Sequence, residues 1–286
     1  MRCTKPFNLK GLMVPCGKCI GCRILLTAEW TERIKSEIDL RQDKLNNWFI
    51  TLTYDDEHLP VDGKLKKIDL LNFLRRLKYE YSKISGRDVC DKENKKFAYY
   101  AVGEYGDRTQ RPHFHIILIG FPLVIRRSPG MRKGFLSEEI SSLWSYGHHL
   151  VGGVSTKSIN YVTGYVRKKA KGLHSFGASE SFAVFSRGIG RIYFEEKWHE
   201  LLRRVKGEVY GDRKIIPRYY KKFIKENYPD VYERYIVQKV IDRTNDTIDS
   251  DYKGSYDNYC RAEDSDALRR SADDRWFEEN IKRGVL

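Results

Sequence analysis

The chain contains 286 residues, of which 53 are Lys or Arg and 39 are Asp or Glu, so its formal charge is +14. Hydrophobic residues make up 41% and aromatic residues 13%, which is too apolar for an intrinsically disordered protein. No apolar run approaches the roughly 18 residues of a membrane span, and the first residues lack a signal-peptide core, which favours a soluble intracellular protein. The excess of positive charge indicates a polyanionic partner such as a nucleic acid.

The charge is divided unevenly along the chain. Residues 242–286 hold 12 acidic and 8 basic side chains, whereas the first 241 residues hold 45 basic and 27 acidic ones, a net charge of +18. The last segment also contains few aliphatic residues, and we interpret it as a solvated or partly disordered acidic tail. The polyanion is therefore expected to bind the basic body of the chain.

Four of the six cysteines lie close together near the N-terminus, at Cys3, Cys16, Cys19 and Cys22. Two consecutive C-x2-C steps let thiolates converge on one ion, and Gly17 and Gly21 permit the tight turns that this requires. We predict a structural zinc ion held by the four thiolates. An iron–sulfur cluster is an alternative, because C-x2-C-x2-C opens the bacterial ferredoxin pattern, although the later Cys-Pro of that pattern is absent. Reduced thiols without a ligand are the other alternative.

The hydrophobic pattern predicts strands and helices in alternation. Apolar residues recur every four positions from Leu26 to Ile38, as in an amphipathic helix, and WFITLTY over 48–54 is typical of a strand. Asp69 is predicted to cap the next helix. The further elements are strands over 97–104 and 112–119, a short helix after Ser137, a strand over 148–154, a helix over 157–171 and basic helical segments over 195–242. This order indicates an α+β fold with a mainly antiparallel sheet.

A histidine pair on a predicted strand is the first candidate for chemistry. His113 and His115 lie two residues apart, so both side chains point to the same face of the strand. Glu104 ends the preceding strand, and a hairpin would bring its carboxylate toward the two imidazoles. Two imidazoles and a carboxylate with open positions form a site for a divalent metal that acts as a Lewis acid. Hydrogen-bonded core histidines are the alternative.

A tyrosine pair on a predicted helix is the second candidate. Tyr161 and Tyr165 lie four residues apart and so share a helical face. The apolar stripe of this helix lies on the opposite side, at Ile159, Val162, Val166 and Ala170. The tyrosines are therefore left on a basic face together with Lys157 and Lys168. Two ordinary packed tyrosines are the alternative.

Three motifs in this order resemble those of the HUH endonucleases. FITLTY over 49–54 resembles the first motif, RPHFH over 111–115 the metal-binding second motif and YVTGYVRKK over 161–169 the two-tyrosine third motif. With VPCGKCIGCR near the N-terminus and the later SRGIG and IPRYYKK, the chain resembles more closely the rolling-circle replication initiators of the Microviridae, in their gokushovirus-like branch. The resemblance covers about residues 1–225.

The resemblance implies an HUH-type central antiparallel sheet flanked by helices, with a Cys-rich metal-binding segment before it and helices after it. It divides the chain into a Cys-cluster segment with an amphipathic helix (1–46), an HUH nickase core (47–195), a basic helical region (196–241) and the acidic tail (242–286). Tyr161 and Tyr165 are implied as nucleophiles, and Glu104, His113 and His115 as ligands of Mg²⁺ or Mn²⁺. The basic side chains expected to contact DNA are Lys157, Arg167, Lys168 and Lys169.

The implied reaction is cleavage of single-stranded DNA at a viral replication origin. A tyrosine would attack a phosphate, form a 5′-phosphotyrosine and free a 3′-OH for rolling-circle synthesis, and the second tyrosine would allow the product circle to be rejoined. Host helicase and DNA polymerase are the expected protein partners, in the cytoplasm of an infected bacterium. A non-catalytic zinc-stabilised nucleic-acid-binding protein is one alternative, and a plasmid or mobile-element relaxase or transposase of the same superfamily is another.

Overall fold

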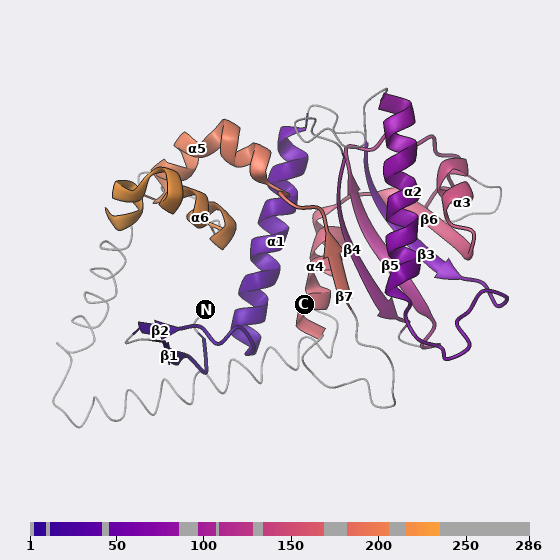
Figure 1. Cartoon of the computed structure of the whole chain (residues 1–286), viewed down its shortest axis with the longest axis horizontal. Helices are drawn as coiled ribbons and strands as arrows, with labels where there is room; N and C mark the ends of the chain where they lie inside the picture. Colours follow the sequence, from indigo (N-terminus) through magenta and orange to yellow (C-terminus); the bar gives the residue numbers. More distant parts are fainter. Residues whose placement is uncertain are drawn as a thin grey trace. The chain divides into compact units, whose positions relative to one another are not determined.

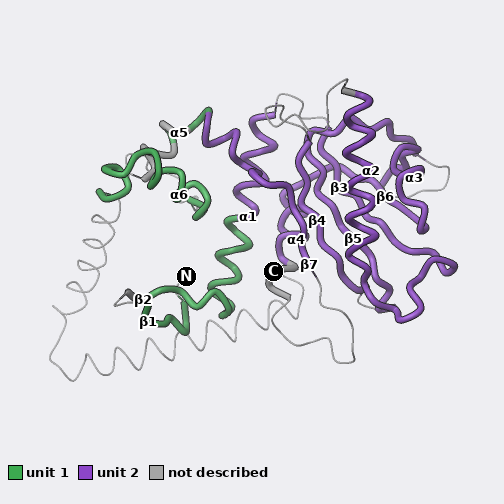
Figure 2. Tube along the Cα trace, viewed as in Figure 1, with its two compact units in different colours: residues 1–29, 196–286 green, residues 30–195 purple. Residues whose placement is uncertain are grey.

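The computed structural model describes eight stretches of the chain, namely residues 3–9, 12–41, 46–85, 97–106, 109–127, 134–168, 182–205 and 216–234. The chain forms two compact units (Figure 2). One consists of Met1–Glu29 together with Glu196–Leu286, and the other is Trp30–Glu195. The acidic tail predicted over 242–286 lies outside the described residues.

The unit Trp30–Glu195 is built on a five-stranded sheet with the strand order β6-β3-β5-β4-β7 (Figure 1). Every pair of neighbouring strands is antiparallel. The strands are β3 (Asn47–Tyr54), β4 (Ala98–Tyr105), β5 (Pro112–Ile119), β6 (Gly147–Gly153) and β7 (Phe182–Phe185). This arrangement confirms the predicted α+β fold with an antiparallel sheet flanked by helices, and β4 and β5 form the predicted hairpin.

Helices cover both faces of this sheet. The helices α2 (Lys67–Ser85) and α3 (Glu138–Leu143) pack on one face, where Phe114 of β5 is fully buried against Tyr54 and Trp144. On the other face lie α4 (Thr156–Lys168) and the part of α1 (Ile20–Leu40) that belongs to this unit. β5 is buried on both faces because its residues alternate between these two helical layers.

One predicted helix start is wrong. α2 begins at Lys67, so Asp69 lies inside the first turn instead of capping it. The Asp69 carboxylate is used differently: it accepts a hydrogen bond of 2.8 Å from the hydroxyl of Tyr54, which is 1% exposed. A partner for this buried hydroxyl takes precedence over a cap, because an unsatisfied buried polar group is the more expensive defect.

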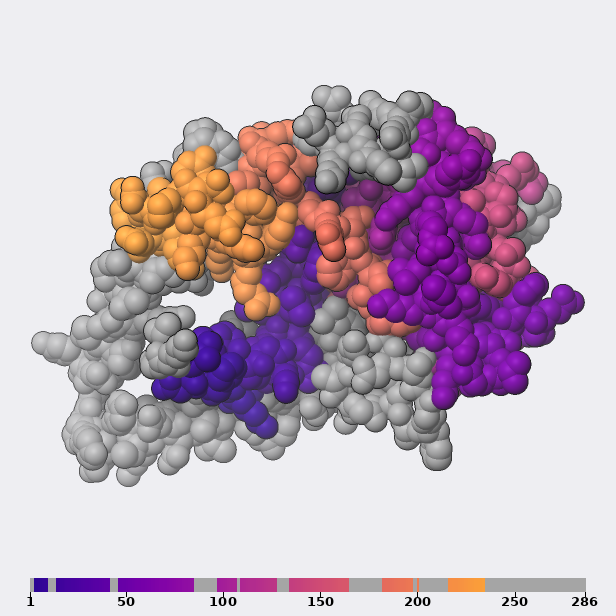
Figure 3. Space-filling model, viewed as in Figure 1, coloured from indigo at the N-terminus to yellow at the C-terminus, as the bar shows by residue number. Residues whose placement is uncertain are grey.

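The loop over residues 55–66, between β3 and α2, protrudes from this unit (Figure 3). Its base is tied to the sheet by Arg111, which donates a hydrogen bond of 2.8 Å to the backbone carbonyl of Tyr54 and also pairs with Asp56. Arg111 directly precedes β5, so the loop starts at the same end of the sheet as the histidine pair.

The second unit contains a short hairpin and helices. The hairpin is formed by β1 (Phe7–Leu9) and β2 (Leu12–Val14), and the C-terminal helices predicted from the sequence include α5 (Arg191–Val205), which spans the unit boundary, and α6 (Arg218–Asn227). Within this unit, Glu29 is 6% exposed and accepts hydrogen bonds of 3.1 and 3.2 Å from Arg218. Among the described helices, none has the length and hydrophobicity of a membrane span.

Two adjacent histidines on β6 have structural surroundings. The Nε2 atom of His149 accepts a hydrogen bond of 3.0 Å from the backbone N–H of Ser137, which precedes α3. Burial lowers the pKa of His149 below its usual value, and the nearby His148 lowers it further. Folding therefore favours the neutral form of His149.

We expect the stability of the fold to fall in mild acid because His149 must stay neutral. Its folded-state pKa lies below the unfolded value of about 6.5, so its contribution is complete above that pH and is lost as the pH falls toward the lowered pKa. The substitution His149→Gln keeps an acceptor for Ser137 but cannot titrate. Urea unfolding between pH 7.5 and pH 5 should show a shallower pH dependence for His149→Gln than for wild type.

The control is His148→Gln, which alters the exposed neighbour and should retain most of the wild-type pH dependence. Equal slopes for wild type and His149→Gln would contradict the assignment.

Candidate active site

The register of the central hairpin brings the candidate ligands to one face of the sheet. Glu104 on β4 lies directly opposite His113 on β5, and Thr51 on β3 lies directly opposite His115. Cross-strand partners project to the same face, and so do residues two apart on one strand. All four side chains therefore point toward the helical layer that contains α4.

The three predicted ligands converge on one point. The Oε1 atom of Glu104 lies 2.9 Å from Nε2 of His113 and 2.7 Å from Nε2 of His115. Glu104 is 3% exposed and His115 is 8% exposed, so the group is largely shielded from water. One ligand atom from each residue lies within 4.8 Å of the other two.

The opposite ring nitrogens orient the two imidazoles. Nδ1 of His113 lies 3.0 Å from the backbone carbonyl of Arg111, which can only accept, so this nitrogen carries the proton. Nδ1 of His115 lies 3.0 Å from the hydroxyl of Thr51, which can accept its proton as well. Each Nε2 then presents a lone pair to Glu104, and three acceptors meet at one point. A cation satisfies such a set, and nitrogen and oxygen ligands of this kind fit a divalent metal.

The electrostatics of Glu104 agree with this. Burial alone would raise the pKa of Glu104, but the interactions with His113 and His115 outweigh burial and hold its pKa below the ordinary value. Glu104 is therefore a carboxylate at neutral pH, as a metal ligand must be.

Tyr161 lies directly beside this group. Its hydroxyl donates a hydrogen bond of 3.0 Å to Oε1 of Glu104, the same oxygen that faces both imidazoles. The Tyr161 ring meets the His115 ring edge-on, with centroids 5.2 Å apart. Tyr161 is nevertheless 47% exposed, so a substrate can reach its hydroxyl from solvent.

Phe49 is a site residue that the sequence analysis did not single out. It stacks on His115 at 5.3 Å with an interplanar angle of 14° and meets the Tyr161 ring edge-on at 6.5 Å. Thr51, the partner of His115, was missed in the same way. Both belong to the FITLTY motif and lie two residues apart, so the alternation of the strand is the signal that would have placed them on the face of the histidines.

The position of α4, which carries Tyr161, is set by polar contacts with α1 that the sequence did not predict. The Thr31 hydroxyl donates a hydrogen bond of 3.1 Å to Oδ1 of Asn160 and lies 3.0 Å from the Thr163 hydroxyl. The Thr163 hydroxyl also donates to the backbone carbonyl of Ile159 at 2.9 Å. Thr31 and Thr163 are buried, so these contacts are shielded from water.

Several predicted site residues fall where little is described. Tyr165, Arg167 and Lys168 belong to α4, but their side chains lie outside the described part of the structure, as does the whole of Lys169. Lys157 is exposed and lies one helical turn before Tyr161, so both occupy the same face of α4.

The four N-terminal cysteines are also brought together. Their sulfur atoms lie within 4.8 Å of one another, in the unit that contains Met1–Glu29. The chain therefore has two groups of potential metal ligands among its described residues, one with nitrogen and oxygen atoms and one with sulfur atoms only.

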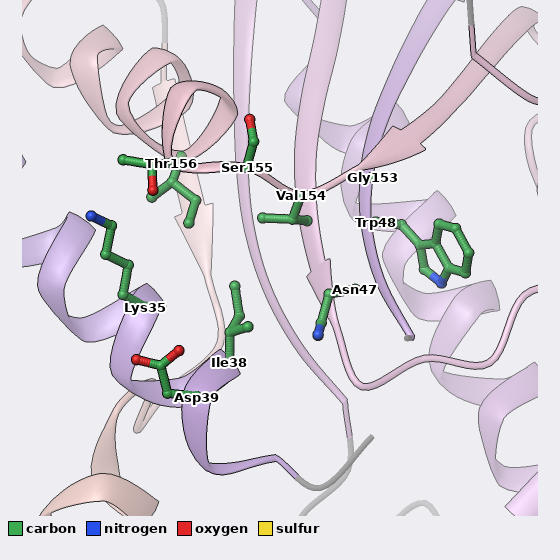
Figure 4. A pocket seen from close by; sticks show the side chains of 10 residues that line it. Lys35, Ile38, Asp39, Asn47, Trp48, Gly153, Val154, Ser155 and Thr156 are labelled. Carbon is green, nitrogen blue, oxygen red and sulfur yellow. The ribbon is translucent and has the colours of Figure 1, made fainter. Parts of the chain in front are cut away.

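A cavity of about 450 Å³ lies beside the start of α4. Figure 4 shows Lys35 and Asp39 of α1 on one side of it and Ser155 and Thr156 on the other. Trp48 at the start of β3 also contributes to its lining. None of the candidate ligands and neither tyrosine lines this cavity, so the convergent group around Glu104 is a separate feature.

The fold and the site together define an α+β protein with a candidate metal group on an antiparallel sheet and a tyrosine poised above it. Residues 47–170, which contain Glu104, both histidines and Tyr161, match the ORF2 family of replication-associated proteins. No solved structure matches the chain.

Three phage proteins are similar to the chain over most of its length. Replication-associated protein VP4 of Bdellovibrio phage phiMH2K is 34% identical over 239 residues, which cover 80% of this chain and 72% of the relative. Replication-associated protein ORF2 of Spiroplasma virus 4 is 29% identical, with 79% and 72% covered, and ORF4 of Chlamydia phage 1 is 27% identical, with 74% and 54% covered. The chain belongs to this family of phage replication-associated proteins, which confirms the resemblance to Microviridae initiators.

The contacts of Thr31 lead to a prediction about stability. The substitution Thr31→Val keeps the size of the side chain but removes the hydroxyl, and it should lower the free energy of unfolding by about 1–3 kcal/mol because buried polar atoms of α4 lose a partner. Thr31→Ser, which keeps the hydroxyl, is the matched control and should lose less. Urea denaturation followed by circular dichroism measures both. A Val variant as stable as wild type would show that these contacts do not hold α4.

Proposed function

We propose that this protein is a metal-dependent endonuclease that nicks single-stranded DNA at a phage replication origin through a tyrosine nucleophile and later rejoins the ends. The observation that carries the proposal is the hydrogen bond from the Tyr161 hydroxyl to Oε1 of Glu104, the atom on which both imidazoles converge. A nucleophile and a metal-ligand group then share one atom, as a phosphate-cleaving site requires.

Glu104, His113 and His115 would hold a divalent metal, and Mg²⁺ or Mn²⁺ suits phosphate chemistry. When bound, the metal would polarise the scissile phosphate and offset the charge that develops on its oxygens. The protein's part is to keep the ligands oriented. The Arg111 carbonyl and the Thr51 hydroxyl hold the rings of His113 and His115 so that both Nε2 atoms face the same point.

The nucleophilic step balances without another reactant. The Tyr161 hydroxyl oxygen forms a bond to phosphorus as the bond from phosphorus to the 3′ oxygen breaks, and the 3′ oxygen takes up a proton as the hydroxyl gives one up. The product is a 5′-phosphotyrosine and a free 3′-OH, and the phosphodiester bond energy is conserved in the protein–DNA linkage. The hydrogen bond to Glu104 orients the Tyr161 hydroxyl for this attack.

Tyr165 is proposed as the second nucleophile. It lies four residues after Tyr161 on the same helix, so the two share a face of α4. After one round of synthesis, Tyr165 would cut the regenerated origin, and the released 3′-OH would attack the first phosphotyrosine and close the circle. Two tyrosines on one helix let the protein alternate between them without releasing the DNA.

DNA would approach along the exposed side of α4. Lys157 lies on the same face as Tyr161, one turn before it, and the first 241 residues carry a net charge of +18. Lysine side chains contact phosphates as compact charges, and basic surfaces attract single strands at long range. Arg167, Lys168 and Lys169 extend the basic sequence beyond the tyrosines and are proposed as further phosphate contacts.

The free 3′-OH defines the partners that the reaction needs. It is a primer end, so a DNA polymerase would extend it, and a helicase would separate the strands ahead of synthesis. We propose that the host supplies both, within the infected bacterial cell, since the similar proteins are replication-associated proteins of phages.

Substitution of the tyrosines tests the nucleophile. Incubation of wild type with single-stranded phage-origin DNA and Mn²⁺ should give a covalent protein–DNA band on a denaturing gel. Tyr161→Phe should lower the initial amount at least about 100-fold if Tyr161 cuts first, and the double variant Tyr161→Phe/Tyr165→Phe should give none, because no hydroxyl remains to attack. Tyr79→Phe, which changes an exposed tyrosine of α2, should behave as wild type.

An adduct formed by the double variant would show that another residue is the nucleophile. Wild type that binds origin DNA but neither cuts nor links to it would favour a non-catalytic nucleic-acid-binding protein.

Substitution of the ligands tests the metal group. His113→Ala, His115→Ala and Glu104→Gln should each reduce adduct formation in Mn²⁺ by about 100-fold or more, because each removes one ligand of the group. EDTA should abolish the adduct of wild type, and added Mn²⁺ or Mg²⁺ should restore it. His148→Gln, outside the group, is the control.

Binding of single-stranded DNA by the same variants separates chemistry from folding. It should stay within a few-fold of wild type, since the ligands are not proposed to contribute most of the affinity. Full adduct formation in EDTA would refute metal dependence.

A further inference from the structure

The N-terminal cysteines form a ligand group that the proposed DNA chemistry does not use. Their four sulfur atoms lie within 4.8 Å of one another, and those of Cys3 and Cys19 are 3.7 Å apart. They belong to one compact unit, whereas Glu104 and the two histidines belong to the other. We propose that Cys3, Cys16, Cys19 and Cys22 bind a single structural zinc ion as thiolates.

The spacing of the sulfur atoms separates a single ion from a cluster. Zn–S bonds of about 2.3 Å at the tetrahedral angle place neighbouring sulfurs about 3.8 Å apart. The 3.7 Å between Cys3 and Cys19 matches this value. In an iron–sulfur cluster each cysteine binds a different iron, with sulfides in between, so the thiolates stand farther apart. The geometry thus decides against the ferredoxin-like alternative that the sequence left open.

The backbone around Cys16 is folded to support thiolates. Its sulfur accepts N–H groups of Lys18 at 3.4 Å and Cys19 at 3.2 Å, and its own N–H donates to the sulfur of Cys3 at 3.2 Å. Gly17 has φ = +70°, which a residue with a side chain rarely adopts, so glycine allows this turn. Backbone N–H groups that point at sulfur favour the charged thiolate, the form that binds metal.

The hairpin between the ligands explains why the segment needs an ion. β1 and β2 have only three residues each, and all three residues of β1 are exposed. A two-stranded ribbon this short, without a packed apolar face, is not stable alone in water. Cys3 precedes β1, Cys16 and Cys19 follow β2, and Cys22 is buried in the first turn of α1. One ion bound to all four would join both ends of the hairpin to the helix.

The chemistry of binding is simple and balanced. Four thiols release their protons to solvent as four Zn–S bonds form, and no atom is oxidised or reduced. Four protein ligands complete a tetrahedral shell and leave no open position, so the ion is structural and does not bind substrate.

The experiment measures metal in the full-length protein, purified without added metal. Elemental analysis should find about one zinc per chain in wild type and none in Cys16→Ser/Cys19→Ser. Cys90→Ser/Cys260→Ser removes the two other cysteines of the chain and should retain the zinc. His113→Ala/His115→Ala should retain it as well, because the proposal places the ion at the cysteines and not at the sheet.

Cobalt substitution keeps the proposal testable if the cysteine variant does not fold. Wild type loaded with Co²⁺ should show the strong visible and near-ultraviolet bands of a tetrahedral cobalt–thiolate site. Wild type without zinc, iron in place of zinc, or zinc retained by a folded Cys16→Ser/Cys19→Ser variant would each overturn the proposal.

Hydrogen exchange tests the structural role of the ion. Removal of zinc by a chelator should abolish the protection of residues 3–22 and leave residues 47–54 and 112–119 of the sheet protected. Unchanged protection of residues 3–22 in the zinc-free protein would refute the structural role. The assay of the covalent adduct is independent of these measurements, so a failure of the zinc proposal and a failure of the proposed nicking activity can be told apart.

Discussion

The candidate site depends on the register between β4 and β5, which sets Glu104 opposite His113. Because side chains alternate along a strand, a slip of one residue would turn both imidazoles toward α2 and bring Phe114 into the site. The register is enforced from the other face, where Phe114, Ile116 and Leu118 are fully buried in the core. Hydrophobic burial on one side of the sheet thus fixes the geometry of the polar group on the other side.

The parts that the sequence predicted are those that follow from local periodicity. Alternation along RPHFH placed the two histidines on one face, and a spacing of four placed Tyr161 and Tyr165 on one side of a helix. A hairpin between two adjacent strands then brought Glu104 to the histidines with little freedom. Each of these inferences needs only neighbours in the chain, which is why one sequence was enough.

The parts that were missed depend on segments distant in the chain. The contacts of Thr31 with Asn160 and Thr163 join residues about 130 positions apart, and nothing in either segment alone indicates them. Phe49 and Thr51 lay within a recognised motif, but their contacts with His115 required the pairing of β3 with β5. Asp69 was misread because its partner, the Tyr54 hydroxyl, lies on a strand whose burial the sequence could not reveal.

The pentapeptide RPHFH illustrates how tightly the layers of this unit are joined. Its two histidines face the tyrosine helix, while the Phe114 between them contacts Tyr54, Trp144 and Phe182 on the opposite side. The identity of the middle residue is therefore governed by the volume available beneath the sheet and not by catalysis. A graft of the histidine motif into another scaffold would have to carry a matching aromatic cluster with it, or the two ligands would rest on a cavity and lose their alignment.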